Sequence, residues 1–187
     1  MAIDRDDAST TLQDIEGVQR RTREQLTYAS ISSILIAWGV LVAGAYIYNH
    51  FQVQRAWQVW LAVILTGVGI TIWSRVRYRK ASGAPADNRV SYSMIALIVF
   101  GLIWSVLLGR MPDRAMGTFW PTLFMFGYVV MGLWLGRFFT YCGVAVTGLA
   151  LAGYFWLGAW FHLWMAAVMA GAFIGSGLWL RRLRTPA

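Results

Sequence analysis

Six long apolar segments alternate with short polar segments along the chain. They cover approximately residues 30–48, 57–73, 90–108, 118–135, 138–157 and 161–180. Each is close to the roughly 20 residues that a helix needs to cross the hydrocarbon core of a membrane. The pattern therefore predicts an all-α polytopic membrane protein with six transmembrane helices.

The segment before the first span has a different, amphipathic pattern. Its apolar residues recur at helical steps and begin with Leu12, Ile15 and Val18. We predict that residues 9–28 form an amphipathic helix on the cytoplasmic surface of the membrane, with nearby arginines facing anionic lipid. These arginines are Arg20, Arg21 and Arg23. The alternative is a docking helix whose apolar stripe enters the groove of a cytoplasmic protein.

Three regions follow from this pattern. Residues 1–29 are expected to be a cytoplasmic N-terminal segment, residues 30–180 a six-helix transmembrane domain, and residues 181–187 a basic cytoplasmic tail. Only Gly158, Ala159 and Trp160 separate the last two spans, which predicts a tight helical hairpin with Gly158 at the turn. Small and turn-forming residues at 81–88 predict an inner loop that follows the basic cluster.

Composition supports a lipid environment. The chain of 187 residues is 58% hydrophobic and 13% charged, with a mean hydropathy of +0.55, whereas soluble domains carry about 25% charged residues. Eleven Trp and eight Tyr suit the interface between hydrocarbon and headgroups. The chain therefore has too much apolar surface to bury in a single soluble core.

Basic residues predict the orientation. If the N-terminus is cytoplasmic, thirteen Arg and Lys residues lie on that side, and only Arg55, Arg110 and Arg114 lie outside. This distribution follows the positive-inside rule and predicts a bacterial inner-membrane protein with both termini in the cytoplasm. It also accounts for the net charge of +8, so no nucleic-acid partner is expected. The polar first 29 residues do not have the pattern of a cleavable signal peptide.

Catalytic and coupling chemistry is sparse in the predicted spans. No Asp, Glu, Lys, Arg or His falls in the centre of a span, which argues against ion-coupled transport. Ser176 and His162 lie fourteen residues apart on one helix, roughly 21 Å, and cannot form a protease dyad. We therefore expect a protein that is not an enzyme. A facilitator for a small neutral or lipidic molecule stays open, because uncharged polar residues could line its pathway: Thr66, Thr71, Ser105, Thr122, Tyr128, Thr147, Tyr154 and Ser176.

Two histidines are predicted to lie at similar depth near the outer surface. His50 ends the first span and His162 begins the sixth, so together they could ligate haem or a metal. Two imidazoles without further ligands form a weak pattern, and interfacial anchoring suffices to explain them. We therefore expect no cofactor and keep the histidine site as an alternative.

Glycines at helical spacing predict close helix packing. Gly132 and Gly136 are four residues apart in the fourth span, and Ala167, Gly171 and Gly175 follow the same step in the sixth. Small residues at this spacing allow helix backbones to approach each other in lipid. We expect the partner helices to lie within this chain, and leave a homo-oligomer open.

Three stretches resemble a loose group of uncharacterised bacterial inner-membrane proteins with six helices. They are I-E-G-V-Q-R-R-T-R at 15–23 leading into A-W-G at 37–39, Y-F-W-L-G-A-W-F-H-L-W-M at 154–165, and G-L-W-L-R-R at 177–182. The first has the form I-E-x-x-Q-R-R-T-R. The resemblance implies the same six-helix architecture and no particular activity.

Polar residues are concentrated on the predicted cytoplasmic face. Our leading hypothesis is an accessory, sensor or regulatory protein that is not an enzyme and that contacts lipid or a cytoplasmic partner through helix 9–28 and the basic loop at 75–89. The basic residues of that loop include Arg75, Arg77, Arg79 and Lys80.

Overall fold

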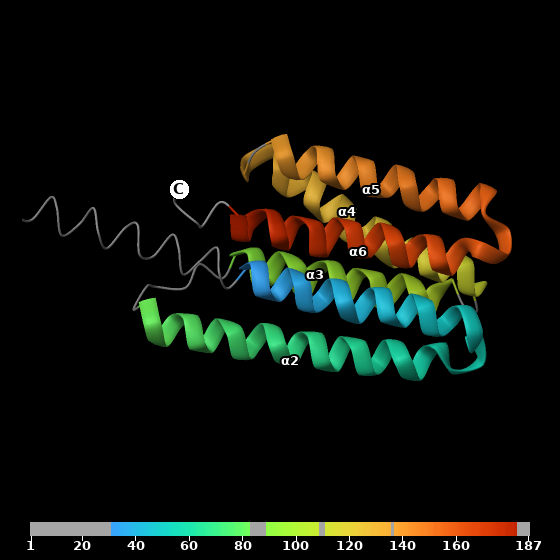
Figure 1. Ribbon diagram of the computed structural model, residues 1–187, viewed down its shortest axis with the longest axis horizontal. Coiled ribbons are helices and arrows are strands. Elements are labelled where there is room, and N and C mark those ends of the chain that lie inside the picture. The colour runs from blue at the N-terminus through green and yellow to red at the C-terminus, as the bar shows by residue number, and fades with distance from the viewer. Residues whose placement is uncertain (1–30, 83–88, 109–110, 136, 183–187) are drawn as a thin grey trace, which may run out of the picture.

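Six long helices make up the part of the protein that the structure describes (Figure 1). The computed structural model describes residues 31–82, 89–108, 111–135 and 137–182. The helices are the first helix, Ile31–Phe51, then α2, Ala56–Ser82, α3, Arg89–Leu107, α4, Asp113–Leu135, α5, Arg137–Trp156, and α6, Phe161–Arg182. Short 3-10 turns, η1 (Val53–Arg55) and η2 (Gly158–Trp160), precede α2 and α6. The predicted helix at 9–28 lies outside the described residues.

The structure confirms an all-α polytopic membrane protein. Four helices are long and apolar enough to cross a membrane: the first helix, α2, α5 and α6, and α3 contributes a shorter apolar stretch, Tyr92–Leu107. Large apolar side chains face outward, such as Trp57 and Leu65 on α2 and Val106 on α3. Hydrocarbon is the solvent that accommodates such a surface.

The two ends of the bundle differ in chemistry. Successive helices reverse direction, so the connections after the first helix, α3 and α5 all lie at one end (Figure 1). We call it the histidine end, because His50 and His162 lie there. The opposite end, the arginine end, carries basic residues of α2 and α6. Those that the structure describes are Arg75, Arg77, Lys80, Arg181 and Arg182.

Two helices extend beyond the spans predicted from the sequence. α2 has 27 residues and continues through the basic cluster to Ser82, so it is about 40 Å long at 1.5 Å per residue. The prediction of a basic loop beginning at residue 75 is therefore wrong for residues 75–82. Arg and Lys are good helix formers, so charge alone does not end a helix. α4 begins at Asp113, five residues before the predicted span.

The first helix lies between α2 and α6. A methyl group added at Gly39 would meet Ile174 Cγ1 of α6 at 2.6 Å, and one at Gly67 of α2 would meet Trp38 at the same distance. Trp38 Nε1 also donates to Thr71 Oγ1 on α2 at 3.0 Å. These glycines let the first helix approach both neighbours closely.

The arginine ends of the first helix and α6 are also hydrogen-bonded. The buried Ser32 Oγ donates to the Gly177 carbonyl oxygen at 2.7 Å. Ser32 Oγ in turn accepts a hydrogen bond from Arg181 Nε at 3.2 Å. Ser32 therefore links the start of the first helix to the end of α6.

The core of the bundle is apolar and rich in methionine. Tyr46, Phe161, Met165 and Met169 are fully buried, and small residues such as Ala150 pack against them. The core combines the first helix with α4, α5 and α6. These side chains form a packed, apolar interior.

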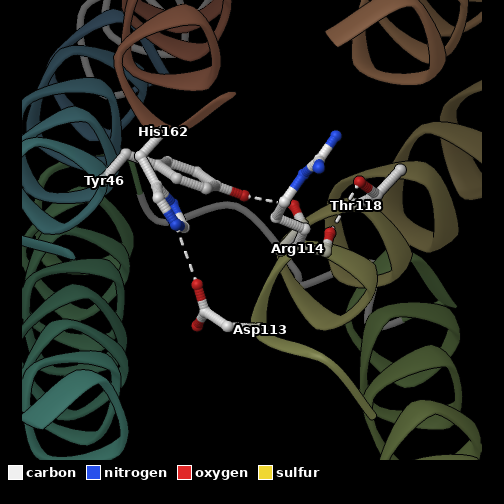
Figure 2. Close-up of polar contacts among 6 residues, drawn as sticks. Tyr46, Asp113, Arg114, Thr118 and His162 are labelled. Carbon is white, nitrogen blue, oxygen red and sulfur yellow. Dashed lines mark hydrogen bonds and ion pairs between the residues drawn. The ribbon is translucent and has the colours of Figure 1, made fainter. Parts of the chain in front are cut away.

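A proline in α4 explains one polar contact in this core. Pro121 has no N–H, so the Gly117 carbonyl, four residues earlier, lacks its usual helical donor. The Tyr46 hydroxyl from the first helix donates to this oxygen at 2.5 Å (Figure 2). A freed backbone carbonyl inside a membrane protein needs such a partner from a neighbouring helix. Gly117 also lets Phe161 of α6 pack closely, because a methyl group at Gly117 would meet Phe161 Cε1 at 3.1 Å.

The glycine motifs have different outcomes. Gly132 is buried and packs closely against Thr140 of α5, whereas Gly136 lies outside the described residues. On α6, Ala167, Gly171 and Gly175 are exposed, and the space beside both glycines is open. Within the described residues, this stripe therefore does not pack against another helix. α6 instead packs through Gly177, beside Ile36 of the first helix.

The hairpin between α5 and α6 is confirmed. Leu157 follows α5, and Gly158 has a φ of +45°, the left-handed conformation that favours glycine. The η2 turn then leads directly into α6. This tight reversal places His162 at the histidine end.

Candidate functional site

A cavity of about 480 Å³ opens at the histidine end. All three connections at this end contribute to its wall. The lining residues are His50, Val53, Pro112, Asp113, Arg114, Gly158, Ala159 and His162. The cavity is therefore the place where the three helical hairpins meet.

An acid and a histidine from different helices face each other in this wall. His162 Nε2 of α6 lies 2.8 Å from Asp113 Oδ2 of α4, and Figure 2 shows the two side chains pointing toward one another. His162 is more than nine-tenths buried, whereas about a third of the Asp113 side chain is exposed. Asp113 also lies in the first turn of α4, where a negative charge interacts favourably with the helix dipole.

Arg114 extends away from this pair, toward α5 (Figure 2). Its terminal nitrogen donates to the Tyr154 carbonyl oxygen. The guanidinium carbon lies 5.5 Å from the Tyr154 ring centre and 5.7 Å from that of Phe161. These contacts fix the positive charge between α4, α5 and α6, on the other side of the α4 terminus from Asp113.

Several buried polar atoms here have no hydrogen-bond partner among the described residues. They include Asn49 Oδ1, Arg114 Nε and His162 Nδ1. Asn49 is 1% exposed and directly precedes His50 on the first helix. An unpaired buried polar group costs roughly 1–3 kcal/mol. These unpaired atoms lie at the histidine end, and two of the three residues, Arg114 and His162, line the cavity.

The structure brings the two predicted histidines to one cavity. His50 and His162 both line it, and the His50 ring stacks on Trp160 with centroids 5.9 Å apart. Within the described ranges, no three His, Cys, Asp or Glu side chains are grouped closely enough to hold a metal ion. The shared location was predicted, but a preformed metal site is not present in this part of the chain.

The predicted cytoplasmic residues are partly described. Arg75, Arg77 and Lys80 are exposed on the last turns of α2, and the Arg77 guanidinium carbon lies 5.4 Å from the Trp73 ring centre. Arg79 lies in α2, but its side chain is outside the described set. The N-terminal residues Leu12, Ile15, Val18, Arg20, Arg21 and Arg23 also lie outside it.

Sequence reasoning missed three residues of the histidine end. The distribution of basic residues places Arg114 on the outer side without a role in a site, and the sequence pattern predicts no role for Asp113 or Asn49. One available signal was that Asp113 is the last acidic residue of the chain and is followed directly by an arginine. Opposite charges beside each other at a helix start suggest that each one meets a different partner.

Three of the eight polar residues proposed to line a pathway are engaged within their own helices. Thr71, Ser105 and Thr122 donate to backbone carbonyl oxygens three or four residues earlier, at 2.8–3.0 Å. Such bonds satisfy the hydroxyl without a pore. The facilitator hypothesis stays an alternative prediction.

Comparison with known proteins adds no relative. No protein-family model, curated protein or solved structure matches this chain. The function must therefore be argued from the site itself.

Proposed function

We propose that this chain is a sensor or regulatory protein of the bacterial inner membrane that is not an enzyme. The cavity at the histidine end faces outward and binds a small molecule, and the arginine end faces the cytoplasm and contacts a partner. Placing the basic residues of α2 and α6 inside agrees with the positive-inside rule.

One observation carries this proposal: the first helix and α6 each contribute side chains to the cavity region and to the contact at the arginine end. The first helix bears Tyr46 and His50 near the cavity and Ser32 at the arginine end. α6 bears His162 in the cavity wall and Arg181 at the opposite end. A ligand that changes the distance between these helices at the cavity therefore biases the contact between Ser32 and Arg181.

The arginine end suits an acidic partner. The basic side chains described there are Arg75, Arg77, Lys80, Arg137, Arg181 and Arg182, and Asp113, at the opposite end, is the only acidic residue in the described part of the chain. Such a surface attracts anionic headgroups or an acidic protein segment, at about 1 kcal/mol per charge near an anionic membrane. We favour a cytoplasmic protein, because helix α2 carries Arg75, Arg77 and Lys80 on an extension that continues about two turns beyond Trp73.

Co-purification tests this function. Tagged protein is extracted in a mild detergent, and retained proteins are identified by mass spectrometry. Replacing Arg75, Arg77 and Lys80 together by Gln should remove a retained cytoplasmic protein. Arg55→Gln, which removes an exposed charge at the histidine end, is the matched control and should retain it. Deletion of residues 1–28 tests the contribution of the N-terminal segment in the same assay.

The cavity must also influence that interaction. Asp113→Asn should change the amount of partner retained, although the substitution lies at the opposite end of the bundle. Equal retention by the wild type, the triple Gln variant and Asp113→Asn would contradict the proposal. Retention that depends on anionic lipid alone would make the arginine end a lipid-binding surface instead.

A further inference from the structure

We propose that the cavity at the histidine end recognises a primary ammonium group. This inference rests on the proposed function, because it names the chemistry of the ligand that the cavity would sense. The ammonium would come from an ethanolamine lipid headgroup or from a soluble amine, which share the same –NH₃⁺ group.

The negative charge of the cavity is the first argument. Asp113 supplies the only carboxylate in the described part of the chain, and it lies in the cavity wall. Its Oδ2 atom is buried beside His162 Nε2, so the exposed third of the side chain belongs to its other atoms. The second carboxylate oxygen is therefore the atom that a cationic ligand would meet.

The neighbouring positive charge does not cancel this site. Asp113 and Arg114 are consecutive, but Figure 2 shows the guanidinium extending away from the Asp113–His162 pair. Arg114 is held there by the Tyr154 carbonyl oxygen and by two aromatic rings. Arg114 also lines the cavity, but its guanidinium group is turned away from the Asp113 carboxylate that a ligand would contact.

His162 and Asp113 offer hydrogen-bond acceptors in the cavity wall. His162 Nε2 lies 2.8 Å from Asp113 Oδ2, and with the hydrogen of a neutral imidazole on Nε2, Nδ1 is an acceptor. Nδ1 is buried without a hydrogen-bond partner in the described structure. An ammonium group has three donors and no acceptor, which complements the Asp113 carboxylate and His162 Nδ1.

The two imidazole rings of the cavity wall have aromatic neighbours. The His50 ring stacks on Trp160, and the His162 ring centre lies 6.3 Å from that of Tyr46. A desolvated cation gains attraction from the faces of such rings. The cavity volume of about 480 Å³ is within the range of sites for small molecules.

Lipid and soluble sources can be separated experimentally. The wild-type protein is exchanged into nanodiscs that contain phosphatidylethanolamine or phosphatidylcholine with identical acyl chains, and retained lipid is measured by native mass spectrometry. The two headgroups carry the same charge, but only ethanolamine has N–H donors. We expect roughly tenfold stronger retention of phosphatidylethanolamine, as befits charged hydrogen bonds. Free ethanolamine is then titrated against protein in a phosphatidylcholine nanodisc, with tryptophan fluorescence as the signal.

Variants locate the binding group. Asp113→Asn keeps the shape of the side chain and should abolish the preference for phosphatidylethanolamine and any ethanolamine signal. Arg55→Gln is the control, because Arg55 does not line the cavity, and should preserve both. Thermal unfolding of each variant identifies loss of fold, and the headgroup preference of the wild type tests the proposal even if Asp113→Asn is unstable.

Each outcome decides the proposal. Selective lipid retention supports the lipid source, and an ethanolamine signal supports the soluble source. Equal retention of the two lipids together with no ethanolamine signal overturns it, as does binding of Zn²⁺ that amines do not displace. If the cytoplasmic partner still co-purifies in that case, the proposed function stands and only the ammonium ligand is wrong.

Discussion

The contact between Tyr46 and the proline-freed carbonyl allows a quantitative prediction. Tyr46→Phe removes the hydroxyl that donates to Gly117 O at 2.5 Å but keeps the ring, which packs edge-on to Trp60 at 5.1 Å. The carbonyl is then left without a donor. Hydrogen bonds between membrane helices contribute about 0.6–1.7 kcal/mol, and an unpaired buried group costs roughly 1–3 kcal/mol. We expect Tyr46→Phe to lower the free energy of unfolding by about 1.5 kcal/mol.

A double-mutant cycle isolates the cause. In Pro121→Ala, residue 121 regains an N–H that donates to Gly117 O within α4, so Tyr46→Phe should then cost about 0.5 kcal/mol or less. The resulting coupling of about 1 kcal/mol is measurable by reversible unfolding in mixed detergent micelles. Tyr48→Phe, at an exposed position of the same helix, is the control and should have no effect. Equal costs of Tyr46→Phe in both backgrounds would refute the assignment of this hydroxyl to the carbonyl freed by the proline.

Three further predictions concern packing, the polar site and topology. Gly177→Ala should lower the free energy of unfolding by about 1–3 kcal/mol, because the added methyl group would meet the Ser32 carbonyl oxygen at 3.0 Å. Gly171→Ala places its methyl group in open space and should be neutral or slightly stabilising in the same unfolding assay. His162→Leu should destabilise the protein by about 1–2 kcal/mol by leaving Asp113 without its imidazole, and the double variant with Asp113→Leu should recover part of that loss. Lys80, the only lysine, should react with a membrane-impermeant amine reagent in inverted vesicles and not in intact cells. Labelling in intact cells would reverse the proposed orientation.

The spans were predictable because their physical requirement is simple. Hydrocarbon thickness sets a length of about 20 apolar residues, and all six predicted segments correspond to helices. The helix ends were less predictable, because residues beyond the hydrocarbon are free to remain helical. α2 shows this with its basic last turns. Length and hydropathy therefore predict where a helix crosses, and not where it stops.

The candidate site depended on contacts that no local pattern contains. Alternating topology placed His50 and His162 at the same end, but nothing in the sequence pairs His162 with Asp113. Pro121 signals a free carbonyl four residues earlier, yet the donor comes from the first helix. The small residues of α6 likewise indicate a surface that another helix can approach closely. Whether a helix lies against that surface depends on the arrangement of the bundle, and no described residue contacts a methyl group added at Gly171.

The hydrogen bond from Tyr46 also constrains how the chain is assembled. A ribosome releases the first helix into the bilayer long before α4, so the hydroxyl is already in place when the proline-containing segment arrives. Were the order of these helices reversed, as in a circular permutant beginning with α4, that segment would enter lipid with a bare carbonyl and no neighbour to bond it. Because this tyrosine precedes the proline along the chain, the order of synthesis supplies the donor before the proline-containing helix needs it.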